Sequence, residues 1–310
     1  MIGDIASKKV CGGSEGANTG KLGCLSLFGT PTHLIALSKG FEVLATEDFN
    51  FDYLAPLVQK GTMIPLIDSS AFEDVSSEDA YSTNARGIKR LNVKGLPEYK
   101  LRFEEGHEFY RELSKMESFK RYDYLIGDAE GNWMLVKKSN GNYQGFTAGH
   151  TTPELTKRKV EGGDPEYKTF LVQFLDRLQW DKNYDILHAE DLDLTPQEMP
   201  VINGTEIAFS AVPASADTDL IVTVVLASDK STVVEGLVDT DFEVKVDDVA
   251  VVISTVVEAP LGTYTITIPA VTAAQVVTVE QYDLDALANV ALSNGVLYRN
   301  TLDNSAVVSA

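Results

Sequence analysis

The chain has 310 residues, 44% hydrophobic and 23% charged, which is ordinary for a protein with room for two packed cores. Its 46 acidic and 26 basic residues give a net charge of −20, the opposite of the basic footprint expected of a nucleic-acid binder. No apolar run reaches the length of a membrane span. The first ten residues have no hydrophobic core, so we expect no secretory signal and synthesis in the cytoplasm.

Residues 1–40 are rich in Gly, Ser, Thr and Lys and are predicted to form an N-terminal arm. Such a segment is either frayed or ordered only against a neighbouring subunit. Cys11 and Cys24 lie in it without a nearby His, which argues against a zinc site. Free thiols are expected, and a disulfide is the alternative in an oxidising compartment.

Residues 41–200 are predicted to form a mostly β domain with two helices. The first helix is expected at 46–60, capped by Thr46 or Asp48 and split by Pro56 into two short turns. A strand at 63–67 and an exposed acidic loop at 69–83 should follow.

Alternating residues then predict a hairpin over 85–103, turning at Gly95-Leu96-Pro97. The clearest helix is expected at 104–118, where Phe109, Leu113 and Met116 share one face. Strand patterns follow at 122–128, 133–138, 143–148 and 166–180. Turn signals at Asp128–Asn132 and Ser139–Asn142 join the first three. The segment 157–162 carries more charged strand-like sequence, and 184–199 is predicted to be an acidic linker.

Residues 201–310 carry 15 acids and 3 bases and are predicted to form an immunoglobulin-type sandwich with a loose tail. Residues 202–282 lack Trp, Cys and His. Strand patterns lie at 218–226, 241–246, 249–254, 262–268 and 275–282, and a last strand is expected at Val296–Arg299. The predicted fold class is therefore mainly β (α+β): a sandwich or barrel domain with two flanking helices, followed by a second sandwich.

Groups that would carry catalysis are scarce. The four histidines His33, His107, His150 and His188 are far apart and lack metal-ligand spacing, and no phosphate-binding glycine loop or nucleophile elbow occurs. Trp133 and Trp180 are expected to anchor the core. Acidic residues are so abundant that a carboxylate pair of the glycosidase kind stays open. We predict no catalytic residue, no cofactor and no metal.

The order of these parts resembles phage tail-tube (major tail) proteins of the long, flexible-tailed type. The hairpin at 85–103, the helix after it, the strand pairs around the two turns and the C-terminal sandwich carry this resemblance. It implies a structural subunit of the virion tail that forms homohexameric rings, which stack into the conduit for DNA ejection. It also implies contacts with other tail proteins and with genomic DNA that passes without tight binding. The acidic residues Glu73, Asp74, Glu78 and Asp79 are predicted to lie in a lumen or inter-ring loop.

The sequence is also compatible with two other functions. One is a capsid decoration or head-fibre protein whose sandwich binds host-surface glycans. The other is a cell-envelope hydrolase with an accessory module, which requires a cleft with a carboxylate pair or a metal.

Overall fold

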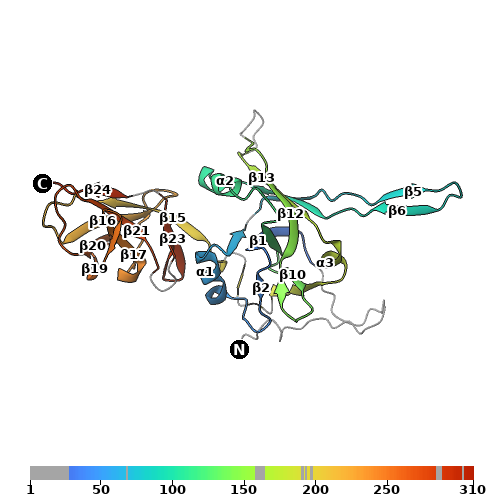
Figure 1. The fold of residues 1–310 in the computed structure, drawn as a ribbon, viewed down its shortest axis with the longest axis horizontal. Coiled ribbons are helices and arrows are strands. Elements are labelled where there is room, and N and C mark those ends of the chain that lie inside the picture. The colour runs from blue at the N-terminus through green and yellow to red at the C-terminus, as the bar shows by residue number, and fades with distance from the viewer. Residues whose placement is uncertain are drawn as a thin grey trace. The chain divides into compact units, whose positions relative to one another are not determined.

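The structure is a computed structural model that describes residues 28–67, 69–157, 165–189, 192, 194–195, 198–283, 288–301 and 304–310. Most of the predicted N-terminal arm, with Cys11 and Cys24, lies outside these residues, as does most of 157–162. The chain forms two compact units, 1–54 with 62–199 (unit 1) and 55–61 with 200–310 (unit 2). The fold is mainly β, as predicted, with several sheets (Figure 1).

Unit 1 is built on one twelve-stranded sheet whose main path runs β2-β11-β10-β9-β12-β13-β7-β4. On its flanks β1 pairs with β9 and β3, β14 with β10, and β8 with β12. The strands are β1 (Pro31–Ser38), β2 (Glu42–Val43), β3 (Met63–Leu66), β4 (Ala71–Asp74), β7 (Glu98–Phe103), β8 (Ser118–Phe119), β9 (Tyr122–Asp128), β10 (Trp133–Lys137), β11 (Tyr143–Gln144), β12 (Phe146–Pro153), β13 (Lys168–Phe174) and β14 (Tyr184–Leu187).

The two predicted glycine turns are confirmed. Gly131, between β9 and β10, and Gly141, between β10 and β11, both have positive φ, which glycine adopts without strain. The first turn is further stabilised by Asp128, whose carboxylate accepts bonds from the backbone of Glu130 and from both nitrogens of Asn132. Local sequence therefore determines these two strand connections.

Three α-helices lie in the described residues: α1 (Phe51–Gln59), α2 (His107–Ser114) and α3 (Arg177–Asp181). The predicted cap of α1 is wrong, because Asn50 Oδ1 accepts the bond from Tyr53 N at 3.0 Å. Pro56 lies within one continuous helix instead of dividing it.

The predicted strand at 166–180 is only half right. β13 ends at Phe174, and the Asp176 carboxylate then caps α3 by accepting a bond from Leu178 N at 2.9 Å. The predicted linker also contains β14, which pairs with β10. Short polar segments of this kind become regular only when a neighbour supplies the hydrogen-bond partners.

The predicted acidic loop at 69–83 and the hairpin at 85–103 are both corrected by the structure. β4 pairs with β7, β5 (Ala80–Thr83) pairs with β6 (Lys89–Val93), and the chain reverses between β5 and β6. Residues 71–103 thus form one long hairpin, and Gly95-Leu96-Pro97 lies along one of its sides. The glycine and proline there indicate an irregular strand, not a reversal.

Unit 2 is a sandwich of two sheets, ordered β19-β20-β16-β15-β23-β22 and β18-β17-β21-β24. Its core lies between them, with Val222 and Tyr264 from the first sheet and Phe242 and Val279 from the second fully or almost fully buried. β15 and β23 pair in parallel, and the other pairs are antiparallel. The strands are β15 (Ile202–Phe209), β16 (Asp219–Leu226), β17 (Phe242–Val246), β18 (Val249–Val251), β19 (Thr255–Glu258), β20 (Thr263–Thr267), β21 (Val276–Gln281), β22 (Ala291–Ser293), β23 (Val296–Asn300) and β24 (Ser305–Val307).

One buried carboxylate in unit 1 makes stability depend on pH. Asp123 Oδ2 accepts a bond from Gly40 N at 2.8 Å, but Asp123 Oδ1 is buried without a partner. Burial raises the pKa of Asp123, so its contribution to stability is present at low pH and is lost as pH rises through the folded-state pKa. We expect Asp123→Asn to stabilise unit 1 at pH 7 more than at pH 4. Urea unfolding at both pH values measures this, and an equal change at both would contradict it.

Candidate functional site

The feature of unit 1 that its own core does not explain is the outer half of the long hairpin. Strands β5 and β6 extend as a narrow two-stranded ribbon beyond the other strands of the unit (Figure 1). Every residue from 80 to 94 is exposed, and we call this segment the ribbon. A two-stranded hairpin with both faces exposed to solvent is only marginally stable on its own. We therefore expect the ribbon to be stabilised by contact with a partner.

The turn at the tip is well specified by sequence. Asn84 Oδ1 accepts bonds from Arg86 N and Ile88 N, and Gly87 has a positive φ of 76°. An Asn side chain that bonds to the backbone two residues further on, followed by a glycine, is a strong turn former. This signal could have revealed the hairpin from the sequence.

The ribbon exposes apolar side chains as well as strand edges. Tyr81 is 57% exposed and stands directly across from Leu91, which is 42% exposed. Residues opposite each other in an antiparallel pair share a face, so these two form one apolar spot. Ile88 and Val93 are exposed too. Exposed apolar groups beside open strand edges are typical of surfaces that pair with another chain.

The charge of the ribbon is opposite to that of the chain. Arg86, Lys89, Arg90 and Lys94 lie in it, and it contains no acidic residue. The whole chain carries −20, so the residues outside the ribbon carry −24. The surface best matched to the ribbon is therefore acidic.

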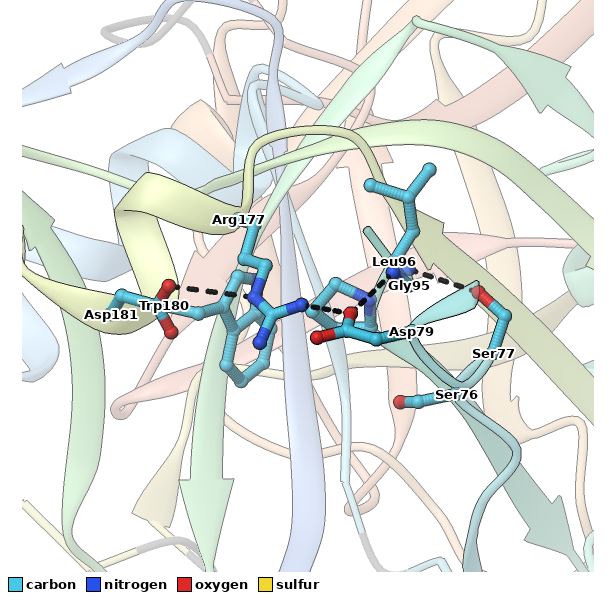
Figure 2. A pocket seen from close by; sticks show the side chains of 9 residues that line it. Ser76, Ser77, Asp79, Gly95, Leu96, Arg177, Trp180 and Asp181 are labelled. Carbon is cyan, nitrogen blue, oxygen red and sulfur yellow. Dashed lines mark hydrogen bonds and ion pairs between the residues drawn. The ribbon is translucent and has the colours of Figure 1, made fainter. Parts of the chain in front are cut away.

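Between the ribbon and the twelve-stranded sheet, residues 75–79 and 95–98 form a segment that we call the neck. A recess of about 340 Å³ lies beside it, and there Arg177 stands between Asp79 and Asp181 (Figure 2). A second recess of about 280 Å³ holds the Lys100–Glu154 ion pair, and Arg102 stacks on the Tyr167 ring at 3.8 Å. In both recesses these charged groups pair with protein partners, as in surface ion-pair networks.

The four acidic residues predicted for a lumen loop do not form one loop. Glu73 and Asp74 are successive residues of β4 and so point to opposite faces of the sheet. Asp79 accepts bonds from Gly95 N and from Arg177, both of which lower the pKa of its carboxyl, and Glu78 is exposed beside it. Polar strands without a core show no hydrophobic period, which is why the sequence predicts a loop here.

No three His, Cys, Asp or Glu side chains in the described part of the chain come together as metal ligands. His33 is buried on β1, whereas His150 on β12 is exposed. Trp133 is fully buried, as expected, and Trp180 packs against the core of unit 1.

Comparison with known proteins gives no match, either to a family model or to a curated sequence. Among the described residues, no helix is long and apolar enough to cross a membrane. The ribbon and its surroundings are therefore the features of the molecule that bear on its function.

Proposed function

We propose that this chain is a structural, non-catalytic virion subunit that binds copies of itself to form rings, which stack into a phage tail tube. The observation that carries the proposal is the ribbon at 80–94, whose fifteen residues are all exposed. A segment with this much open backbone and apolar surface is explained by a contact that a single chain does not supply.

The ribbon favours another copy of this chain as its partner. The basic ribbon is attracted to a second copy, because the rest of each chain carries a net charge of −24. When the ribbon of each copy binds a different surface on the next copy, without reciprocal exchange, the contact is heterologous. Heterologous contacts close into rings or continue as filaments, and both belong to tube architecture.

Net charge also agrees with a conduit for DNA. A lining rich in carboxylates repels phosphate and avoids the counterion release that drives tight binding. In this proposal Glu73, Asp74 and Glu78 are candidates for the lining, and because Glu73 and Asp74 point to opposite faces, only one of these two lines it. Asp79 is the weakest of the four candidates, because Arg177 neutralises its charge. Genomic DNA and other tail proteins are the further partners that the proposal implies.

The test is the oligomeric state of the purified full chain at high concentration. We expect closed rings or stacked tubes in negative-stain images, and a mass in solution that is a multiple of 33.8 kDa. A strictly monomeric protein under the same conditions would overturn the proposal. Binding of the ribbon to duplex DNA, with no self-association, would overturn it as well.

A further inference from the structure

The neck joins the ribbon to the sheet, but it is not a regular strand ladder. Regular pairing of β4 with β7 ends at Asp74 opposite Tyr99, and pairing of β5 with β6 begins at Ala80 opposite Val93. Backbone bonds continue between them only from Val75 N to Glu98 O and from Ser77 N to Leu96 O, at 2.9 and 3.3 Å.

Side chains accept the other bonds between the two sides of the neck, and Pro97 O accepts a bond from Phe174 N of β13 at 2.9 Å. Gly95 N donates to Asp79 Oδ1 at 2.8 Å, Leu96 N to Ser77 Oγ at 2.9 Å and Glu98 N to the Oγ of Ser76 at 3.0 Å. A side-chain acceptor rotates away more easily than a carbonyl fixed in a strand. The neck is therefore the place where the long hairpin bends most easily.

The two sides of the neck also approach each other closely. A Cβ added at Gly95 would lie 1.7 Å from the Ser77 carbonyl oxygen, a distance that no side chain tolerates. Glycine at this position therefore lets the two sides of the neck come together, and the Gly95 N–H donates to the Asp79 carboxylate.

A single ion-paired arginine connects this neck to α3. Arg177 Nη1 donates to Asp79 Oδ1, and Arg177 Nε lies 3.4 Å from Asp181 Oδ2 (Figure 2). The guanidinium thus bridges two segments about one hundred residues apart in the chain. Its planar fork holds both carboxylates in a defined direction.

The helix that carries Arg177 is itself firmly attached to the core. The Trp180 ring lies 4.3 Å from the Phe146 ring and 4.9 Å from the Phe174 ring, between centroids. Gln179 Oε1 accepts a bond from Thr147 N at 2.9 Å, and Gln179 Nε2 donates to Thr147 Oγ1. Arg177 therefore pairs with the neck from a fixed support.

We propose that Arg177 is a positioning residue that latches the neck to α3 and thereby sets the direction in which the ribbon extends. With the latch closed, the ribbon is presented in one orientation, and without it the ribbon swings about the irregular neck. As a device for assembly the latch rests on the proposed function, but its effect on the ribbon can be measured without any assembly.

The direct test measures the distance between spin labels at the ribbon tip and on the body of unit 1. The label sites are Ala85→Cys and Glu117→Cys, in a chain with Cys11→Ser and Cys24→Ser and diluted with unlabelled protein. We expect one narrow distance distribution with Arg177 present and a roughly twofold wider one with Arg177→Ala. An unchanged width, with an unchanged circular dichroism spectrum, would overturn the latch.

Matched variants separate the latch from a general effect of charge. Lys230→Ala removes a more exposed ion pair, with Glu206 in unit 2, and should leave the width unchanged. Arg177→Lys keeps the charge but loses the fork, so it should restore the narrow distribution in part. If the unaltered chain forms rings, Arg177→Ala should reduce them. If it forms none, the proposed function is wrong, but the label distances still show whether Arg177 fixes the orientation of the ribbon.

Discussion

Replacing Tyr81 and Leu91 together by serine is expected to weaken self-association by on the order of 100-fold and to leave the folding of the chain intact. The two side chains form one exposed apolar spot on the ribbon. Burying two side chains of this size against a partner contributes about 3 kcal/mol or more, and about 1.4 kcal/mol is worth a factor of ten in affinity. Neither residue belongs to a buried core, so the thermal midpoint should change little.

Sedimentation over a range of concentrations measures this effect, and negative staining shows whether rings persist. The matched control exchanges Ser82 and Asn92, whose side chains bond to each other at 2.9 Å on the same ribbon. Exchange keeps the composition, charge and length of the ribbon and leaves the apolar spot untouched. If the Tyr81→Ser, Leu91→Ser variant assembles at the same concentration as the unaltered chain, the apolar spot is not the contact.

The parts of the fold that sequence alone predicts are those with a local cause. The turns at Gly131 and Gly141 need a positive φ. The first is also held by a hydrogen bond from Asn132 N to the Asp128 side chain, only four residues away in the chain. The strands of unit 2 have a clear period of two because one face of each sheet is buried. These causes lie within a window of ten residues and can be read without knowing the rest of the chain.

The long hairpin differs from the sequence-based prediction for a physical reason. Hydrophobic alternation reveals a strand only when one of its faces is buried, and the ribbon buries neither. The predicted turn used Gly95 and Pro97, but Gly95 is needed for the close approach of the Ser77 carbonyl. The latch between Asp79 and Arg177 joins residues ninety-eight positions apart, a distance at which single-sequence patterns carry no signal.

Unit 1 therefore separates the residues that hold it together from those that we propose for assembly. Its core is a continuous cluster of aromatic and aliphatic side chains from the sheet and from α2, and the ribbon contributes none of them. α3 is the element that touches both, since Trp180 packs on the core and Arg177 pairs with the neck. A change in the core should consequently affect stability far more than any change in the ribbon.

Phe174→Ala is expected to have the largest effect on the stability of unit 1. Phe174 is 1% exposed, and its ring contacts those of Tyr99, Phe146 and Trp180 at centroid distances between 4.9 and 6.1 Å. Truncating a buried phenylalanine leaves a cavity and typically lowers the free energy of unfolding by about 3–5 kcal/mol. Domains are stable by only about 5–15 kcal/mol, so the variant should be close to unfolding.

Phe119→Ala is the matched control, because it removes the same atoms from β8, where the Phe119 side chain is 70% exposed. It should change the free energy of unfolding by no more than about 0.5 kcal/mol. Urea unfolding of both variants, followed by tryptophan fluorescence, reports on unit 1 because both tryptophans of the chain lie there. Equal losses in the two variants would show that the aromatic cluster around Phe174 is not what holds unit 1 together.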